Sequence, residues 1–510
     1  MTSTERVSAE EISRIAAAHG FSVRKAADIA EIEGVSYTMF HEASGARLLY
    51  LCNDDANKAF SITFKTPAAD DTGVFHILEH SVLNGSRKFP VKEPFVNLLK
   101  TSMQTFLNAM TFPDKTMYPV ASTNEQDLMN LMDVYLDAVF YPAIYDKRAI
   151  FEQEGWHYEL AEGAAADSDA AGEPAAEAGV PGAGAAKAGV PDADAAERLV
   201  YNGVVYNEMK GALSDPDSVL YDTLSAAMFP DTTYRFESGG TPESIPTLTY
   251  EGFVETHRRH YRPDNSYIIL YGNLDPDRFL GFIDEEYLTP LARADRGPLA
   301  VNALENQAPV QPVLAKRSMV TSPENACAAL GFAAGAVADR ERLVAVEILL
   351  DALMGSNEAP MKRALLDAGI AADATAYLAD AIRQPFAVVQ LRGLRDGSVD
   401  DLARIVRAQA QELAAGALDH ALVEASLSRS EFQMRERNFG YPDGVVLAMT
   451  AMSGWLYDDE LSTAYLRYDE LFKSLRRKLD EGYFEQLTRE LFLENDHAAA
   501  AEVVPVEALE

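Results

Sequence analysis

The feature that most constrains the fold of this chain is a short pattern that occurs twice, 270 residues apart. Residues 76–92 align without a gap with residues 346–362, and five positions are identical: leucine at 83 and 353, glycine at 85 and 355, serine at 86 and 356, proline at 90 and 360, and lysine at 92 and 362. A strand-like segment precedes each copy, near Ser61 and near Gly331. The shared order of strand, turn, helix and glycine predicts two copies of one unit that combines a sheet with helices.

The segments around the two copies support this prediction. Apolar residues that alternate or run together, many of them β-branched, predict strands at 59–66, at 267–271, at the start of 326–338 (with a turn after it) and near Val503-Val504. Helical spacing predicts one helix at 74–83, after a turn at 70–73 and before a stop at Asn84-Gly85, and another at 471–492.

These elements predict an α+β fold of two homologous domains, each a mostly antiparallel sheet layered with helices. We place the domains at residues 1–285 and 310–510, with a linker near 289–313. Residues 161–197 are almost entirely Ala, Gly, Asp, Glu and Pro, which cannot form a core. They predict a flexible surface insertion in the first domain, with a functional lid as the less favoured interpretation.

Composition limits the classes of function. With 48% hydrophobic and 24% charged residues, the 510-residue chain can fill the cores of two to four domains. A net charge of −35 opposes nucleic acid as a partner. It either favours cationic ligands such as basic peptides or only keeps an acidic protein in solution, and the sequence leaves both interpretations open. No apolar run reaches the roughly 18–20 residues that cross a bilayer, so no membrane partner is expected. Without a hydrophobic targeting segment, Cys52 and Cys327 are expected to be buried thiols, which predicts a cytoplasmic protein.

The candidate catalytic site lies in the first copy, in the pattern His76-Ile-Leu-Glu79-His80. Residues four apart lie on one face of a helix, so the two imidazoles can bind one metal ion. Glu79 projects toward the same ion without needing to bind it, which suits a general base that takes a proton from metal-bound water. A lone helical histidine usually packs or caps, but two of the nine histidines at this spacing predict an inverted H-x-x-E-H zinc site.

A catalytic zinc ion needs a third protein ligand, which this helix does not supply. The candidates are acidic or imidazole side chains further along the chain: Glu152, Glu154, His157, Glu159 and Glu208. Glu208 interrupts an apolar stretch, where an unpaired acid is costly to bury and a metal ion would be one partner. Spacing alone leaves two interpretations of Glu208 open, a metal ligand and a solvent-facing acid on an amphipathic helix.

The second copy lacks the metal motif. Its residues at the positions of His76, Glu79 and His80 are Val346, Leu349 and Leu350. Apolar side chains cannot bind a metal ion, so the second domain is predicted to be structural.

Longer stretches resemble the pitrilysin and insulin-degrading metallopeptidases, and in particular their presequence-protease branch. The matching stretches are 76–96, 105–109, 117–122, 133–140, 153–160 and 203–211, and more loosely 354–360. The resemblance implies that His76, His80 and Glu208 bind one Zn²⁺ ion and that Glu79 is the base. His80 and Glu208 are 128 positions apart, and without the 37 residues of the insertion this spacing falls to 91, which is ordinary for the family.

The resemblance also implies a substrate site and a partner. Asn108 and Ala109 match a strand whose edge holds the substrate backbone by strand addition, although Asn108 read alone is equally a turn residue. Members of this branch consist of two halves that close around the peptide, and this chain corresponds to the N-terminal half. We therefore predict a zinc endopeptidase that hydrolyses unfolded peptides in a closed chamber, with a complementary C-terminal half in cis or in trans. The alternative is a peptide-binding, non-catalytic half that needs the missing half for turnover.

Overall fold

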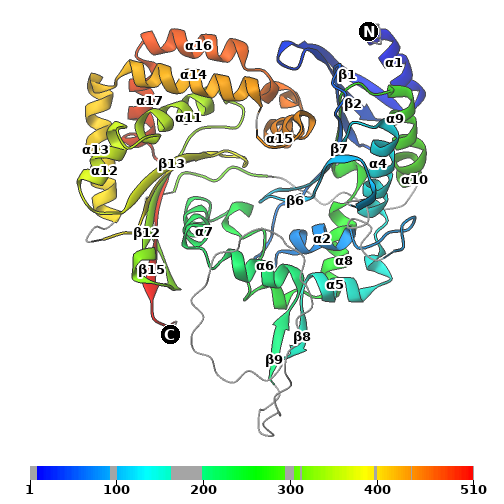
Figure 1. Cartoon of the computed structure of the whole chain (residues 1–510), viewed down its shortest axis with the longest axis horizontal. Coiled ribbons are helices and arrows are strands. Elements are labelled where there is room, and N and C mark those ends of the chain that lie inside the picture. Colours follow the sequence, from blue (N-terminus) through cyan, green and yellow to red (C-terminus); the bar gives the residue numbers. More distant parts are fainter. Residues whose placement is uncertain are drawn as a thin grey trace.

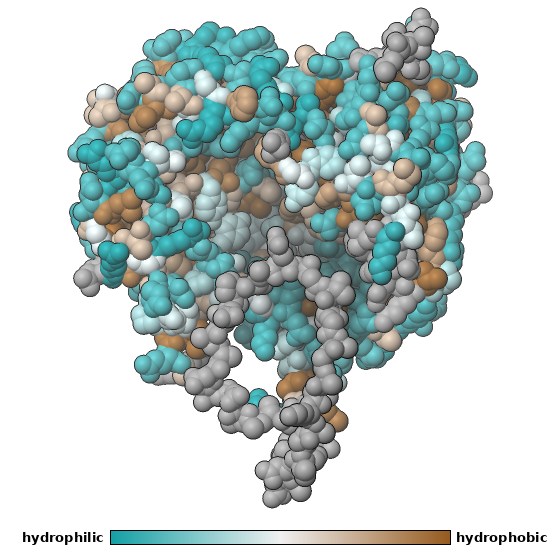
Figure 2. Space-filling view, in the orientation of Figure 1, coloured by the Kyte–Doolittle hydropathy of each residue, from teal (hydrophilic) through white to brown (hydrophobic). Residues whose placement is uncertain are grey.

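The computed structural model describes residues 8–91, 100–161, 198–292, 304–310, 313–395, 399–437 and 439–508. Within these ranges the chain forms two lobes, and each lobe is a sheet covered by helices (Figure 1). The face seen in Figure 2 is largely hydrophilic and is hollowed between the lobes. The predicted α+β class is confirmed.

The first sheet has eight strands in the order β1-β2-β3-β10-β4-β7-β5, with β6 also paired to β7. Neighbouring strands are antiparallel except for the parallel pair β3 and β10. The bounds are β1 Phe21–Ile29, β2 Gly34–His41, β3 Arg47–Cys52, β4 Lys58–Lys65, β5 Gln104–Leu107, β6 Met110–Thr111, β7 Lys115–Ser122 and β10 Ser266–Tyr271. The strands predicted at 59–66 and 267–271 are confirmed as β4 and β10.

The second sheet has five strands in the order β11-β15-β12-β14-β13. Here β11 and β15 are parallel and the other neighbours are antiparallel. The bounds are β11 Leu314–Val320, β12 Cys327–Ala333, β13 Asp373–Ala379, β14 Phe386–Arg392 and β15 Ala498–Val506. The strands predicted in 326–338 and near Val503-Val504 are confirmed as β12 and β15.

The two sheets repeat one strand path. From one edge, β5-β7-β4-β10-β3 in the first sheet corresponds to β13-β14-β12-β15-β11 in the second, and the parallel pair occupies the same place in both. The alignment at an offset of 270 residues places Ser61 in β4 over Gly331 in β12. The sequence repeat is therefore a repeat of topology, and the prediction of two homologous units is confirmed. The boundaries at 285 and 310 stay predictions.

The helices cover both faces of the sheets (Figure 1). Their bounds are α1 Ala9–Ala18, α2 Val74–Val82, α4 Glu125–Phe140, α5 Arg148–Glu154, α6 Val204–Ala212, α7 Pro216–Met228, α8 Tyr250–His260, α9 Pro276–Ile283, α10 Thr289–Ala292, α11 Arg340–Met354, α12 Pro360–Asp367, α13 Val399–Glu412, α14 His420–Glu436, α15 Asp443–Trp455, α16 Asp469–Asp480 and α17 Tyr483–Phe492. The helix predicted at 74–83 is confirmed as α2.

The central strands of the first sheet are buried on both faces. Along β4, Phe60 and Ile62 belong to the core beneath α4 and α9, whereas Ala59 belongs to a second core against α15. Strand β7 is buried along its whole length. This sandwiching explains why β4 contains apolar residues in succession as well as in alternation.

Helices α7 and α15 cross the seam between the lobes. Helix α7 precedes β10 in the sequence, yet Leu224 and Met228 pack it against the second sheet. Helix α15 follows the second sheet's β14, yet Ala448 and Met452 pack it against the first sheet. Each lobe is therefore completed by a helix from the other part of the sequence.

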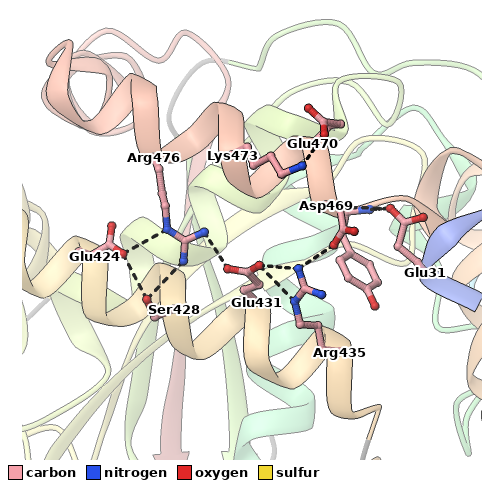
Figure 3. Close-up of polar contacts among 10 residues, drawn as sticks. Glu31, Glu424, Ser428, Glu431, Arg435, Asp469, Glu470, Lys473 and Arg476 are labelled. Atoms are coloured by element: carbon pink, nitrogen blue, oxygen red, sulfur yellow. Dashed lines mark hydrogen bonds and ion pairs between the residues drawn. The ribbon is translucent and has the colours of Figure 1, made fainter.

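A polar network reinforces the seam at the start of α16 (Figure 3). Arg435 of α14 pairs with Glu431 at 2.8 Å and with Asp469 at 2.7 Å. Glu31, in a short 3₁₀ helix (Ala30–Ile32) of the first lobe, accepts hydrogen bonds from the backbone N–H groups of Tyr468 at 2.8 Å and Asp469 at 3.1 Å. These contacts anchor α16 of the second lobe on the first.

Some local predictions need correction or lie outside the described residues. The single helix predicted at 471–492 is wrong, because Gly482 adopts a left-handed φ of 79° and separates α16 from α17. The predicted linker begins with α10, and 293–303 lie outside the described residues. The predicted insertion also lies outside them apart from Ala161, but the strands on either side, β8 His157–Leu160 and β9 Leu199–Asn202, form an antiparallel hairpin.

The cysteines and the helices bear on the predicted compartment. Cys327 is a buried thiol, as predicted, whereas the Cys52 thiol is only half-buried. In the ranges given above, no helix combines the length and the apolarity that crossing a bilayer requires.

Candidate active site

Helix α2 presents the predicted motif at the rim of the first core. It begins after Gly73, whose φ is 64°, and a Cβ at that position would lie 2.3 Å from the carbonyl oxygen of Gly239. Ile77 is fully buried in the core of the lobe, which fixes the rotation of the helix. His76 and Glu79 are 9% and 8% exposed, so the polar groups of the motif are also largely shielded from solvent.

Three side chains converge between α2 and α6: His76 and His80 of α2, and Glu208 of α6. Glu208, on α6, places Oε2 3.7 Å from His76 Nε2 and 3.6 Å from His80 Nε2. The ligand atoms of the three residues all lie within 4.8 Å of one another. In the part of the chain that the structure describes, this is the one group of histidine, cysteine and acidic side chains with such an arrangement.

The second nitrogen of each imidazole contacts a protein oxygen. His76 Nδ1 lies 3.1 Å from the carbonyl oxygen of Gly239, and His80 Nδ1 lies 3.4 Å from Oε2 of Glu154. Glu154 ends α5 and is buried. An imidazole that donates its Nδ1–H in this way keeps Nε2 as the electron-pair donor, so both rings offer Nε2 on the side of Glu208.

The residues present fit a zinc ion. Two imidazoles and one carboxylate form a donor set found at catalytic zinc. Tetrahedral coordination at about 2.0–2.1 Å sets ligand atoms about 3.4 Å apart. The distances from Glu208 Oε2 to the two Nε2 atoms, 3.6 and 3.7 Å, are close to that separation. Such a set also leaves one coordination position for water or substrate.

The electrostatic surroundings shift two groups of the motif. Burial raises the pKa of the Glu79 carboxyl, although a 2.6 Å hydrogen bond from Thr111 Oγ1 and the two imidazoles act in the opposite direction. Burial opposes the charged form of His80, but Glu154 and the other nearby carboxylates outweigh it and raise its pKa. These two pKa directions apply to the site without a bound cation. A bound divalent ion would favour the carboxylate form of Glu79 and the neutral form of His80.

The other candidates for the third ligand lie elsewhere. Glu152 is paired with Arg148 at 3.0 Å, Glu159 accepts a hydrogen bond from Asn202, and His157 Nδ1 lies 2.7 Å from the carbonyl oxygen of Glu152. Glu154 contacts His80, but on its Nδ1 side. Glu208 is not buried, contrary to what its apolar sequence context suggested, because its side chain is 52% exposed. The Glu208 side chain extends from α6 toward both His76 and His80.

The predicted substrate residues lie near the cluster but outside it. Asn108 and Ala109 interrupt the edge of the first sheet between β5 and β6, which both pair with β7. The backbone of Asn108 already bonds inward, since its N–H donates to Pro119 at 3.4 Å and its carbonyl accepts from Tyr135 at 3.2 Å. Thr111, at the end of this edge, contacts Glu79 and so joins the edge to the motif.

Three contributors to the site were not predicted in these roles. Glu154 was weighed only as a metal ligand, and Thr111 and Gly239 carried no signal at all. Gly239 lies on a loop packed closely against Gly73, and Met209 packs against its other side, next to Glu208. Contacts of this kind join residues more than 30 and more than 160 positions apart, and no local pattern reports them.

Two family models match the chain. Residues 67–176 match the model described as Insulinase (Peptidase family M16), and residues 247–429 match the model described as Peptidase M16 inactive domain. The chain belongs to peptidase family M16. The first match contains the H-x-x-E-H helix, and the second contains α11, where the motif is absent.

Known relatives place this M16 chain in the presequence-protease branch. It is 39% identical to Protein HypA of Clostridium perfringens over 95% of its own length and 47% of that protein. It is 36% identical to Presequence protease 1 of Arabidopsis thaliana over 94% of its length and 42% of that protein. The M16 chain thus spans about half the length of the curated relatives it matches.

A solved structure shares the fold. A protease from Helicobacter pylori superposes with a TM-score of 0.68, at 14% sequence identity, over 92% of the M16 chain and 100% of that chain. At this identity the likeness concerns the fold alone, and it agrees with the two-lobed architecture described above.

Proposed function

We propose that this chain is the metal-bearing half of a zinc endopeptidase, in which His76, His80 and Glu208 hold one Zn²⁺ ion. The observation that carries the proposal is the convergence of these three side chains, with ligand atoms within 4.8 Å of one another. Membership of family M16 and the similarity to presequence proteases support peptides as the substrates.

The side chains around the cluster suit hydrolysis. Zinc, when bound, would supply Lewis-acid polarisation and lower the pKa of water. Glu79 is held by Thr111 beside both imidazoles, where a carboxylate can accept a proton from water and return it to the leaving amine. Glu154 and the carbonyl of Gly239 keep the imidazoles oriented, which limits the reorganisation that the reaction would require.

We further propose that the substrates are unfolded peptides. The sheet edge at Asn108 and Ala109 ends at Thr111, next to Glu79, so a peptide added along it would pass the motif. The hollow between the lobes leaves room on this side for an extended chain (Figure 2). A complementary half, in cis or in trans, would close the chamber, as the greater length of the relatives suggests. A cytoplasmic location stays a prediction.

Metal analysis tests the ligand assignment. Wild-type protein loaded with zinc and dialysed is expected to retain one ion per chain by elemental analysis. His80→Ala is expected to lose it, whereas His420→Ala, on exposed α14 and paired with Glu485, is expected to keep it. Full retention by His80→Ala would contradict the proposed ligand set.

A cleavage assay separates the enzyme from the peptide-binding alternative. An internally quenched fluorescent peptide is incubated with the zinc-loaded chain, and binding is followed in parallel by anisotropy. Cleavage that Glu79→Gln abolishes supports a peptidase. Stoichiometric zinc and peptide binding without any cleavage would instead favour a half that needs its complement for turnover.

A further inference from the structure

A cavity of about 240 Å³ lies at the seam between the lobes, and its lining residues do not come from α2 or α6. Its lining residues come mainly from α11, from the end of α14 and from α15, the helix that crosses to the first sheet. Most of its wall is apolar and includes Leu343, Val344, Met434, Phe439 and Leu447. Phe439 is 54% exposed, so apolar surface also continues to the mouth.

Four charged side chains interrupt this apolar wall, and three of them form no ion pair with the residues that the structure describes. These three are Arg340 and Glu347 of α11 and Asp380, which follows β13. Among the same described residues, the buried Nε of Arg340 has no hydrogen-bond partner. The guanidinium instead lies over the ring of Tyr465, 4.7 Å from its centroid. The fourth charged side chain, Arg437, is already paired with Asp443 at 2.8 Å.

Unpaired charges in an enclosed space are unusual because they lose hydration without gaining a partner. The surrounding protein lowers the pKa of Arg340 to about 10 and raises the pKa of Glu347 and of Asp380. All three shifts have burial as their largest cause, so the attraction between Arg340 and the two carboxylates does not offset their loss of hydration. A ligand with complementary charges would.

The spacing of the charges indicates the size of that ligand. Arg340 and Glu347 are seven residues apart on α11, which is two turns and about 10 Å along the helix axis. Leu343 and Val344 lie between them on the same face. An extended peptide advances about 3.3 Å per residue, so about three residues would span the distance. The volume of about 240 Å³ is small for a ligand pocket, so it limits the ligand to a short peptide.

We propose that this cavity binds a short apolar peptide with two free ends, its α-carboxylate on Arg340 and its α-ammonium between Glu347 and Asp380. The apolar side chains of the peptide would lie on Leu343 and Val344 and face Met434. Such a peptide is the chemical class that the proposed hydrolase would release, but binding at this cavity does not depend on zinc. Because α11 and α15 both line the cavity, an occupant would also brace the seam between the lobes.

Isothermal titration calorimetry with the tripeptide Leu-Ala-Leu tests the proposal. The full chain carrying Glu79→Gln is used, so that cleavage cannot disturb the titration. We expect one site per chain, and binding at least tenfold weaker for the N-acetylated peptide and for the C-terminal amide. Equal binding of the free and blocked peptides, or no binding at millimolar peptide, would overturn the proposal.

Substitutions locate the site. Arg340→Gln is expected to weaken binding at least tenfold, and Glu347→Gln and Asp380→Asn severalfold each. Arg363→Gln, an exposed arginine of α12, is the matched control and should bind as the parent does. Because Arg340→Gln alters a largely enclosed residue, the two carboxylate variants decide the outcome if it fails to fold.

A variant of the metal helix separates this site from the proposed active site. His80→Ala added to Glu79→Gln, or chelation of the metal, should leave tripeptide binding unchanged although the proposed metal site is lost. Binding that disappears with His80→Ala but survives all three cavity substitutions would place the peptide at the metal cluster and overturn the proposal. Failure of the zinc-loaded wild-type chain to cleave peptides would count against the hydrolase alone.

Discussion

The equivalent helices of the two lobes, α2 and α11, follow equivalent strands but have different roles. In α2 the positions of the motif hold His76, Glu79 and His80, at the rim of the core beside α6. In α11 the corresponding Val346, Leu349 and Leu350 are at most 2% exposed and belong to the second lobe's core.

The difference shows what each lobe needs from this helix. The strand path depends on apolar side chains that recur in both copies, whereas metal binding depends on three polar positions and on a facing acid from another helix. A change at these positions therefore alters function in one lobe and packing in the other.

The largest effect is expected when the motif is moved into the second lobe. V346H/L349E/L350H would bury two imidazoles and a carboxylate in the apolar core of the second lobe, at a cost of several kcal/mol against a net stability of about 5–15 kcal/mol. We expect loss of the folded protein, measured by circular dichroism and size-exclusion chromatography. The reverse exchange, H76V/E79L/H80L, should keep the fold and lose the metal. If the triple variant of α11 folded and bound zinc, the strand path and the three residues of the motif would be sufficient for metal binding without a facing acid from another helix.

The next largest effect is expected from Glu79→Gln. Removing a general base typically lowers a rate about 10²–10⁴-fold, and the amide keeps the shape of the side chain. Cleavage of a fluorogenic peptide should fall by that factor while the zinc content stays at one ion per chain. The matched change in the second lobe, Leu349→Met, should leave both cleavage and zinc unchanged. If Glu79→Gln cleaved the peptide at the wild-type rate, Glu79 would not be the general base.

A smaller effect is expected from Glu154→Gln, which weakens the contact that orients His80 in α2. Partners of this kind typically change metal affinity about 10–100-fold. Competition with a fluorescent zinc chelator would measure the change. Glu152→Gln is a close control, because Glu152 lies on the same short helix but is paired with exposed Arg148. Equal affinities for the two variants would mean that Glu154 only fills space.

The smallest effect concerns the seam. Burial, followed by the neighbouring Glu237, raises the pKa of Asp222 on α7 to about 9. The folded state then holds a proton that the unfolded state releases above about pH 4, so stability should fall as pH rises from about 4 to 9. Asp222→Asn should flatten this slope, which is at most about 1.4 kcal/mol per pH unit and is reduced by partial exposure. Urea unfolding at pH 6 and pH 7 would measure it. Asp367→Asn, an exposed acid, should keep the wild-type slope.

Sequence patterns predicted the parts of this molecule that are local. The strand β4, the helix α2 and the spacing of His76 and His80 follow from neighbouring residues, and the alignment with α11 predicted that the second helix lacks the motif. Glu208 needed the family resemblance, because spacing left it open and the burial argument did not apply. Its side chain is half exposed, so its own sequence context did not distinguish a ligand from a surface acid.

The features that were missed depend on contacts between distant residues or on a single backbone angle. The break at Gly482 falls between two helices whose apolar spacing is similar, so a continuous helix was predicted. The crossing of α7 and α15 between the lobes depends on which sheet each helix covers, and an amphipathic helix does not specify its partner. The contacts of Thr111 and Gly239 with the motif depend on tertiary packing in the same way.

The hairpin of β8 and β9 has a consequence for how such chains are recognised. Its two legs are held in register, with His157 opposite Asn202 and Leu160 opposite Leu199, directly before the helix that carries Glu208. Residues added at the tip therefore change the number of positions between His80 and Glu208 without moving either side chain. A pattern search that fixes this number would overlook the present chain. A search based on the pairing of the two strands would find it, because strand pairing, and not the number of residues between His80 and Glu208, determines where Glu208 lies.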